Sequence, residues 1–349
     1  MPAIRVLVVD DSALVRQMVT HVLTGASNIE VVGTARDGVE ALTLARQLNP
    51  DVITLDIQMP RMNGLEVLPH LVRDTEARVV MLSSVSDPDT TYQALESGAV
   101  DFVAKPSEGL ATGLEALGMD LVRAIRTANR VPPEKRRIAK SAPGQRPGVS
   151  AADGDPDRLV AIAASTGGPL ALEHVFAGLR PDPHSAFLVL QHLPPGFAAS
   201  LAARLGRASG FPVVEAEDGM RVRTGHGYIA PHGKHMTIEG CPGGRTRIAL
   251  SDGAHIHGVR PSADPLFESV AETFGMRSTG VVLTGMGSDG AHGLLAIRKA
   301  GGRTIAQDEK SSVVWGMPGA AVRLNAAAIV APLDRIAAEI GGSGKEVRR

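Results

Sequence analysis

The sequence has almost no cysteine: Cys241 is the single thiol in 349 residues. One cysteine cannot form an internal disulfide, so a disulfide-stapled scaffold is excluded and a reducing compartment is favoured. Long hydrophobic runs are also missing, and none approaches the about 20 residues that a membrane-spanning helix needs. The first residues, Met-Pro-Ala-Ile-Arg-Val-Leu-Val-Val, lead directly to Asp10 and Asp11 and are too short for the apolar core and cleavage site of a signal peptide. We therefore expect a cytoplasmic protein with no membrane insertion.

An excess of charge of either sign is missing as well. The chain carries 36 Lys and Arg against 37 Asp and Glu, a formal net charge of −1. No global field therefore draws it toward nucleic acid or a membrane surface. Hydrophobic residues make up 44% and charged residues 21%, which is typical of globular protein. At 349 residues the chain is long enough for two domains, each with its own core.

Residues 1–125 alternate between strand-like and helix-like patterns. Short apolar runs occur at Ile4–Val9, Val31–Val32, Val52–Leu55, Val79–Leu82 and Phe102–Val103, and helical periodicity occurs at Ser12–Leu23, Gly38–Leu48 and Gly64–Val72. These βα repeats predict a doubly wound parallel sheet with helices on both faces. Polar residues stand where the runs end: Asp10, Asp11, Asp56, Ser83 and Lys105. They should therefore converge at the carboxyl edge of the sheet.

The three acids in this set would repel one another in a shared crevice, and a hard divalent cation such as Mg²⁺ is the usual remedy. The lysine and the hydroxyl opposite them would donate to a phosphoryl group. A single strand-end acid is more often a turn residue or a helix cap. As an ordered set, these residues resemble the receiver domain of two-component response regulators. The run Asp56–Leu65 (Asp-Ile-Gln-Met-Pro-Arg-Met-Asn-Gly-Leu) is similar to the phosphoacceptor motif of that family.

The receiver resemblance implies a flavodoxin-like fold in which Asp56 is phosphorylated by a partner histidine kinase. The implied Mg²⁺ ligands are Asp10, Asp11, Asp56 and the main-chain carbonyl of Gln58. The implied switch residues are Ser83 and Phe102, with Lys105, before a cis-proline at Pro106, contacting the phosphoryl group. These residue types suit the roles, because a hydroxyl can bond a phosphate oxygen and an aromatic ring can then change its burial.

From Arg123 to about Asp157 the periodicity fails, and proline and glycine become frequent. Residues 123–146 carry eight Lys or Arg against a single acid, Glu134. Such a segment is expected to be a flexible tether, extended by proline and by self-repulsion. Docking against an acidic partner surface is the alternative. We predict a receiver at 1–125, a linker at 126–157, a second domain at 158–341 and a tail at 342–349.

The apolar run Leu159–Ala164 ends at Ser165 and is followed by Thr166–Pro169 and the helix-like Leu170–Ala177. This pattern is typical of a buried parallel strand, a tight glycine turn and a helix. A hydroxyl at this point lies beside the N–H groups of a helix N-terminus, which favour negative charge. The stretch alone leaves a simpler interpretation open, in which Ser165 and Thr166 only cap the helix.

Two later strand-like runs end in residues that could work with Ser165. Ala186–Gln191 precedes His192, and Thr279–Leu283 precedes a glycine-rich turn that contains Asp289. At one carboxyl edge, Asp289 would fix the tautomer of His192, and His192 would take the proton of Ser165 during attack on a carbonyl. The N–H groups of residues 285–287 and of the helix after Ser165 could cradle the oxyanion.

The spacing of these residues does not by itself establish the triad, because the second half of the chain contains nine histidines. The pairs that could bind a metal are His232 with His235 and His255 with His257. No carboxylate or cysteine pattern accompanies them, so surface or substrate-cleft positions are favoured. His292 could replace His192 as the base, but it falls in the first turn of a helix, where the macrodipole disfavours imidazolium. Ser165 lacks the G-x-S-x-G elbow and the loop lacks a Walker lysine, so neither an ordinary α/β-hydrolase nor a phosphate loop is indicated.

Residues 158–340 resemble the catalytic domain of the chemotaxis protein-glutamate methylesterases. The similar segments are Ala163–Pro169, Gln191–Phe197, Ile229–His235, Arg260–Asp264, Leu283–Gly290, Gln307–Glu309 and Gly316–Pro318. The resemblance implies a Rossmann-like three-layer α/β domain with a triad and an oxyanion hole. The implied residues are Ser165, His192 and Asp289 for the triad and Met286 and Thr166 for the oxyanion hole. A receiver joined by a linker to this domain is the architecture of that family.

The resemblance implies a regulated esterase that acts on methyl-accepting chemotaxis receptors. Ser165 would attack the γ-carbonyl of a methylated glutamate, and the same chemistry on glutamine would be deamidation. Mg²⁺ would serve the receiver, and the esterase would need no cofactor. We expect a monomer whose unphosphorylated receiver covers the Ser165 cleft until phospho-Asp56 shifts it away. The rival interpretations are a DNA-binding output, which would need a basic reading helix, and a nucleotide-binding enzyme.

Overall fold

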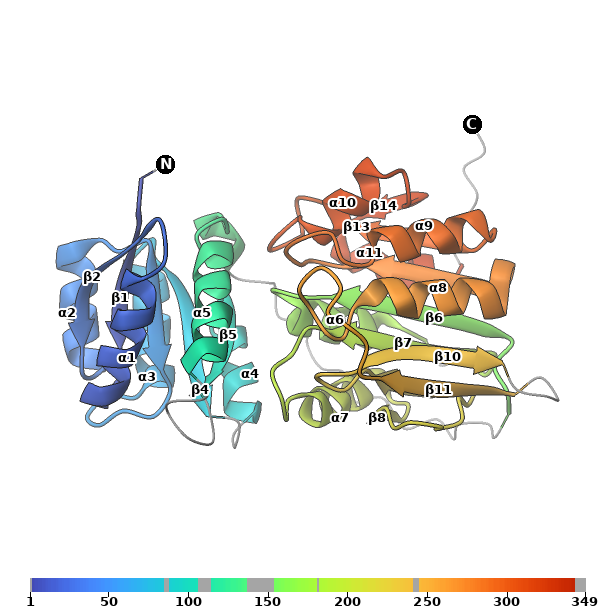
Figure 1. Ribbon diagram of the computed structural model, residues 1–349, viewed down its shortest axis with the longest axis horizontal. Coiled ribbons are helices and arrows are strands. Elements are labelled where there is room, and N and C mark those ends of the chain that lie inside the picture. The colour runs from blue at the N-terminus through green and yellow to red at the C-terminus, as the bar shows by residue number, and fades with distance from the viewer. Residues whose placement is uncertain are drawn as a thin grey trace. The chain divides into compact units, whose positions relative to one another are not determined.

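The protein, shown in Figure 1 as a computed structural model, divides into two compact units, residues 1–140 and 141–349. The structure describes residues 2–84, 88–105, 114–136, 154–180, 182–240 and 245–342. Each unit has its own parallel sheet. Within these ranges, no helix combines the length and the apolar character that crossing a membrane requires.

The first unit contains a five-stranded parallel sheet with the strand order β2-β1-β3-β4-β5. Its strands are β1 (Ile4–Val9), β2 (Ile29–Ala35), β3 (Val52–Asp56), β4 (Arg78–Ser84) and β5 (Asp101–Lys105). Its helices are α1 (Ala13–Thr24), α2 (Gly38–Leu48), α3 (Gly64–Asp74), α4 (Pro88–Glu96) and α5 (Leu114–Ala128). This confirms the predicted doubly wound, flavodoxin-like unit.

The first three helices begin at polar residues that satisfy their exposed N–H groups. The Ser12 side chain accepts from the N–H of Val15 at 3.4 Å, and Asp37 accepts from two N–H groups at 2.9 Å. Asn63 and Glu66 form a reciprocal capping box, with both bonds 2.9 Å long. These caps fix where each helix begins and therefore how each loop leaves the sheet.

The order of the strands creates a binding crevice in the first unit. From β1 the chain moves outward to β2 on one side and then places β3 on the other side of β1. The carboxyl ends of β1 and β3 therefore flank a topological switch point, where open α/β sheets bind ligands. Asp10 and Asp11 follow β1, and Asp56 ends β3, so the predicted acidic residues lie at this crevice.

Helix α5 continues beyond Arg123, where the sequence periodicity was expected to fail. It ends at Ala128, and a short 3-10 helix, η1, follows at Pro133–Arg136. The reason is apolar spacing, because Ile125, Ala128 and Val131 are all 0% exposed and pack into the first unit. The start of the predicted linker is therefore ordered protein, while residues 137–153 lie outside the described residues.

The second unit contains a seven-stranded parallel sheet with the strand order β14-β13-β12-β6-β7-β9-β8, and an antiparallel pair, β10–β11. The strands are β6 (Arg158–Ala164), β7 (Ser185–Gln191), β8 (Val213–Glu215), β9 (Gly227–Ile229), β10 (His235–Gly240), β11 (Thr246–Ser251), β12 (Ser278–Val282), β13 (Arg303–Gln307) and β14 (Ile329–Ala331). The helices are α6 (Gly168–Gly178), α7 (Ala198–Ser209), α8 (Ala263–Phe274), η2 (Gly275–Arg277), α9 (Ala291–Lys299), α10 (Met317–Arg323) and α11 (Leu333–Ile340).

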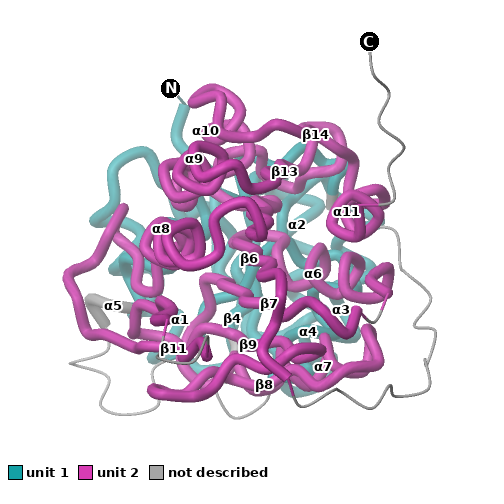
Figure 2. Tube along the Cα trace, turned by 90° about the vertical axis from the view of Figure 1, so that its right-hand side faces the viewer, with its two compact units in different colours: residues 1–140 teal, residues 141–349 magenta. Residues whose placement is uncertain are grey.

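Helices cover both faces of this second sheet. One layer contains α6, α7 and α11, and the other contains α8, α9 and α10 (Figure 2). Between the layers, every residue of β7 is buried, and so is β6 from Leu159 to Ala164, because both faces of these central strands meet helices. The arrangement confirms the predicted three-layer α/β domain.

A second topological switch point lies between β6 and β12. The chain leaves β6 toward β7 on one side and returns as β12 on the other. Ser165 directly follows β6, and the loop 283–290 directly follows β12. The residues that flank this crevice therefore belong to two of the three predicted catalytic segments, those of Ser165 and Asp289.

Candidate active site

Ser165 is held at the carboxyl end of β6 by its own main chain. Its N–H donates to the carbonyl oxygen of Thr284 at 3.0 Å, and its carbonyl oxygen accepts from the N–H of Gly168 at 2.7 Å. The same oxygen accepts from Nε2 of Gln191 at 2.9 Å. The N-cap residue of α6 is Gly167, at φ 75°, and it has no side chain to cap with. Helix capping therefore does not account for Ser165.

His192 and Asp289 meet in a nearly buried contact. His192 Nε2 lies 2.9 Å from Asp289 Oδ2, with the two side chains 10% and 3% exposed. Ala164 pairs with Gln191 in the register of β6 and β7, so Ser165 and His192 are the next residues beyond paired strand ends. The structure thus brings all three predicted residues to one edge. No hydrogen bond between Ser165 Oγ and the His192 ring is found among the described residues, so that contact stays a prediction.

The carboxylate of Asp289 has a full set of donors. The Ser262 hydroxyl donates to Oδ1 at 2.5 Å, and the N–H of Ala263 donates to Oδ1 and Oδ2 at 3.1 and 2.9 Å. Burial raises the pKa of Asp289, but the bonds from His192, Ser262 and Ala263 outweigh it, so the pKa lies below its ordinary value. Asp289 is therefore ionised and can accept from His192 Nε2, which leaves Nδ1 of His192 to take a proton.

The turn after β12 packs directly against Ser165. A Cβ atom on Gly285 would lie 2.8 Å from Ser165 Cβ, so only glycine allows this approach. The N–H of Gly285 donates to the carbonyl oxygen of Val314 at 2.9 Å. This corrects one part of the predicted oxyanion hole, because that N–H is already used. Met286 and Thr166 border the same place, and their role as donors stays a prediction.

The acidic crevice of the first unit contains a bridging lysine. Lys105 Nζ lies 2.7 Å from Asp10 Oδ2 and 2.8 Å from Asp56 Oδ1. One carboxylate oxygen from each of Asp10, Asp11 and Asp56 lies within 4.8 Å of the others, a set of hard oxygen ligands that fits Mg²⁺. Burial raises the pKa of Asp56, Lys105 opposes this and Asp10 adds to it, so the pKa lies above its ordinary value.

The structure describes the other predicted receiver residues, Phe102, Ser83, Pro106 and Gln58, only in part. Phe102 is 7% exposed on β5, and its ring packs edge-on against Tyr92 with 6.3 Å between ring centres. Ser83 lies on β4 next to β5, but its side chain and all of Pro106 lie outside the described residues. Gln58 is exposed two residues after Asp56, and the role of its carbonyl stays a prediction.

Comparison with known proteins decides the family. Residues 160–340 match the model of the CheB methylesterase family, and residues 6–112 match the response regulator receiver domain. The chain belongs to the CheB methylesterase family. A protein-glutamate methylesterase/protein-glutamine glutaminase of Xanthomonas oryzae pv. oryzae is 46% identical over 96% of this chain and 95% of its own length. One of Salmonella choleraesuis is 44% identical over 97% of both.

A solved structure from the same family agrees with the fold. The CheB methylesterase catalytic domain of Thermotoga maritima is 36% identical, with a TM-score of 0.50, and the match covers 55% of this chain and 98% of that domain. Together with the relatives, it confirms both resemblances that the sequence suggested.

Two residues at the CheB site were not predicted from the sequence. Ser262 contacts Asp289, and Gln191 donates to the carbonyl oxygens of Ser165 and His192 at 2.9 and 3.0 Å. Both lie in segments that resemble the family, Arg260–Asp264 and Gln191–Phe197. That position was the available signal, since neither side chain suggests chemistry by itself.

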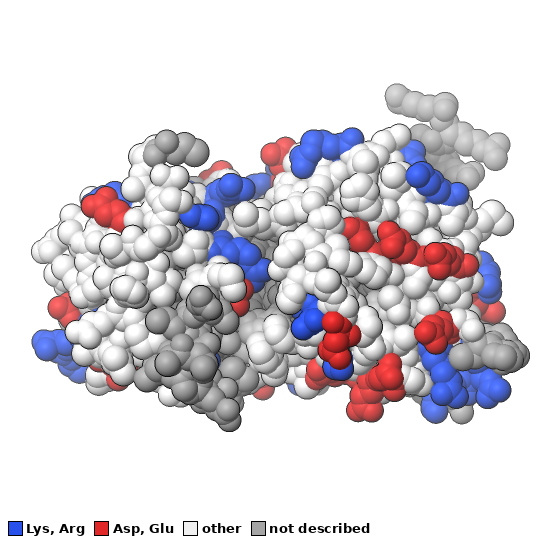
Figure 3. Space-filling model, in the orientation of Figure 1, with Lys and Arg blue, Asp and Glu red and all other residues white. Residues whose placement is uncertain are grey.

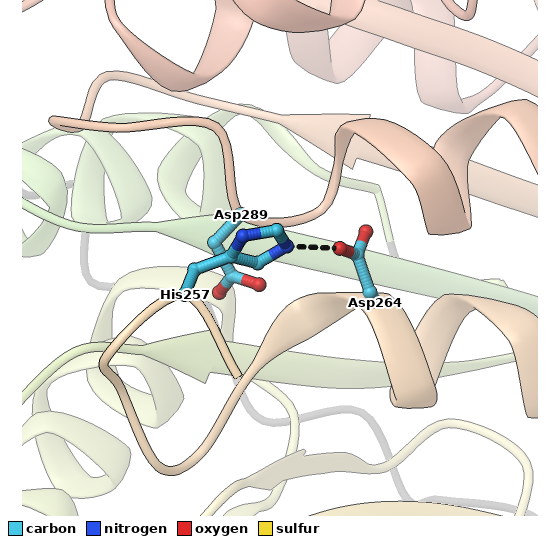
Figure 4. A group of neighbouring side chains, drawn as sticks. All are labelled: His257, Asp264 and Asp289. Carbon is cyan, nitrogen blue, oxygen red and sulfur yellow. Dashed lines mark hydrogen bonds and ion pairs between the residues drawn. The ribbon is translucent and has the colours of Figure 1, made fainter. Parts of the chain in front are cut away.

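Two other histidines of the second unit, His235 and His257, have partners of their own. His235 Nδ1 accepts from the N–H of Ser262 at 3.1 Å, and its Nε2 lies 2.9 Å from the carbonyl oxygen of Ala254. His257 Nε2 lies 2.8 Å from Asp264 Oδ2, beside Asp289 (Figure 4). These three side chains bring possible metal ligands within 4.8 Å of one another. Their carboxylate oxygens already accept hydrogen bonds, which account for the arrangement without a cation.

Proposed function

We propose that this protein is a phosphorylation-regulated protein-glutamate methylesterase that acts on methyl-accepting chemotaxis receptors, and that it also deamidates receptor glutamines. The observation that supports this most is the contact between His192 and Asp289 beside Ser165, at the switch point of the second sheet. The names of the relatives, which give both activities, add support.

The reaction starts with attack of Ser165 Oγ on the ester carbonyl. His192 Nδ1 takes the hydroxyl proton while Asp289 stabilises the resulting imidazolium through Nε2. N–H groups at Met286 and Thr166 stabilise the oxyanion. The C–O bond to methanol then breaks, and His192 returns the proton to the leaving methoxide. Water attacks the acyl-enzyme by the same route and releases glutamate; with glutamine, ammonia leaves instead.

Regulation depends on the receiver. A chemotaxis histidine kinase transfers a phosphoryl group to Asp56, and Asp10, Asp11, Asp56 and the Gln58 carbonyl would hold Mg²⁺. When bound, the cation supplies charge that offsets the carboxylates and the phosphoryl oxygens. Lys105 moves from carboxylate oxygens to the phosphoryl group, and Ser83 and Phe102 respond to it. We place the monomeric enzyme in the cytoplasm, with the linker between the receiver and residues 158–341.

A DNA-binding output finds no support on the face that Figure 3 draws. Acidic side chains gather over α8 on this face. Glu268 and Glu272 are exposed on that helix. Partial burial and the neighbouring acids Asp264 and Glu272 raise the pKa of Glu268. Such a helix would repel a phosphate backbone rather than bind it.

The test is methanol release from methylated receptor membranes, with and without acetyl phosphate and Mg²⁺. Ser165→Ala and His192→Gln should abolish release, and Asp56→Ala should remove the stimulation by acetyl phosphate. His184→Gln is the matched control, because His184 Nδ1 also lies 2.9 Å from a carboxylate, Asp157, but 64% of its side chain is exposed. Wild-type release from Ser165→Ala would refute the mechanism.

A further inference from the structure

The Ser262 hydroxyl makes a short hydrogen bond inside the second unit. Ser262 is 0% exposed, and its Oγ lies 2.5 Å from Asp289 Oδ1. A distance of about 2.5–2.7 Å is typical of a hydroxyl that donates to an ionised carboxylate. The hydroxyl proton therefore points to Asp289, which in turn contacts the imidazole of His192.

Helix capping explains this residue only in part. Ser262 is the N-cap of α8, but the bond that Oγ accepts from the N–H of Asp264 is 3.4 Å long, at the weak end of the range. The main chain of Ser262 is fixed separately, because its N–H donates to His235 Nδ1 at 3.1 Å. The hydroxyl is thus aimed at Asp289 by a scaffold that does not depend on the capping bond.

The geometry points to Ser262 as a positioning residue for the esterase reaction, an inference that rests on the proposed function. With Oδ1 held by the Ser262 hydroxyl and the Ala263 N–H, the Asp289 carboxylate cannot turn about its Cβ–Cγ bond, and Oδ2 stays directed at His192 Nε2. Among the described residues, Ser262 and His192 are the side chains that donate to Asp289. Loss of the hydroxyl would leave the orientation of His192 less fixed.

Other charged groups lie near Asp289 and are already paired. Figure 4 shows His257, from the loop before α8, and Asp264, on α8, beside it. Asp264 accepts from His257 Nε2 at 2.8 Å and from the N–H of Gly293 at 2.7 Å. Neither group donates to Asp289, so neither substitutes for the Ser262 hydroxyl.

Three variants separate positioning from capping. Glycine is nearly as good an N-cap as serine but has no hydroxyl. Alanine is a poor N-cap and also has no hydroxyl, whereas threonine is a good N-cap and keeps the hydroxyl. In the full-length protein we expect Ser262→Gly and Ser262→Ala to lower kcat by about ten- to a hundredfold, the cost of losing a hydrogen bond to a charged group. KM should stay within about twofold, and Ser262→Thr should recover most of the rate. A kcat for Ser262→Gly equal to that of the wild type would overturn the inference.

A second readout does not need the receptor. The rate at which an alkyl fluorophosphonate labels Ser165 reports the activation of the nucleophile alone, and Ser262→Gly should slow it by a factor similar to the loss in kcat. Equal labelling rates would overturn the role of Ser262, whatever the substrate. Slower labelling combined with no methanol release from the wild type would refute the proposed substrate and still support the inference. A wild-type Ser165 that resists labelling would overturn both.

Discussion

Gln191 ties Ser165 to the neighbouring strand: its Nε2 donates to the Ser165 carbonyl oxygen at 2.9 Å. The same nitrogen donates to the carbonyl oxygen of His192 at 3.0 Å. Gln191 is 3% exposed at the end of β7, which pairs with β6. One carboxamide therefore fixes the main chains of the proposed nucleophile and base relative to each other.

Gln191→Glu should lower both kcat and the melting temperature. A carboxylate has no N–H donors, and its buried oxygens would face two carbonyl oxygens, so we expect a loss of at least about 2 kcal/mol of stability. The proposed chemistry should slow by about tenfold or more, because the two strand ends lose their common bond. Calorimetry and methanol release measure the two effects. Gln93→Glu, on the exposed side of α4, is the control and should change neither; a wild-type kcat and melting temperature for Gln191→Glu would contradict this role.

The parts of the fold that were predictable from the sequence are those with strong local patterns. The run Ile4–Val9 and the helix Gly38–Leu48 have the predicted bounds, because a buried central strand and a capped amphipathic helix carry clear periodicity. The edge strand β2 is half-exposed and extends well beyond Val31–Val32, and β8 and β14 have three residues each, too few for any period.

The candidate site was predictable where strand ends determine it. Ser165, His192 and Asp289 could be placed together because carboxyl ends of parallel strands share an edge. Ser262 could not be placed, since it lies 27 residues from Asp289 and reaches it through the packing of α8. The use of the Gly285 N–H by Val314 was equally hidden, because it depends on the loop before α10.

Asp56→Asn should stabilise the first unit at pH 7. The pKa of Asp56 is raised, chiefly by burial, so its ionised form is disfavoured in the folded state. The stability that protonated Asp56 contributes is fully present below the pKa of the unfolded state and is lost as pH rises through the pKa of the folded state. Neutralising the side chain removes that loss, and the melting temperature should rise. Added Mg²⁺ should stabilise the wild type and have a smaller effect on Asp56→Asn. A variant that melts below the wild type in the absence of Mg²⁺ would argue against this account.

Asp289→Asn should affect activity and acid stability in a linked way. The pKa of Asp289 is lowered by its hydrogen bonds, so ionised Asp289 stabilises the folded state. This contribution is present above the ordinary Asp pKa of about 3.9 and is lost as pH falls through the lower pKa of the folded state. The wild type should therefore lose its stability advantage over Asp289→Asn in acid. At neutral pH, kcat should fall by about 10³–10⁴-fold, because asparagine stabilises neither the required tautomer nor the imidazolium. Urea titrations from pH 7 to pH 3 would show the first effect, and an advantage that does not shrink as pH falls below the ordinary Asp pKa would refute it.

Gly285→Ala should damage the site through crowding alone. The added Cβ would clash with Met317 Sδ and would lie 2.8 Å from Ser165 Cβ and 3.1 Å from Ser165 N, so the turn after β12 must move away from the nucleophile. We expect a destabilisation of about 1–3 kcal/mol and a severe loss of kcat. Trp315, which forms a parallel β-bridge with Gly285, is the sole tryptophan of the chain, so its fluorescence reports the displacement.

Gly206→Ala is the matched control for Gly285→Ala. In helix α7 the added Cβ makes contacts of 3.5 Å or longer, and alanine there should stabilise the protein by about 0.5–1 kcal/mol. We expect the melting temperature to fall in Gly285→Ala and to rise in Gly206→Ala, with the fluorescence change confined to Gly285→Ala. Equal shifts would show that the turn at Gly285 has room for a Cβ beside Ser165.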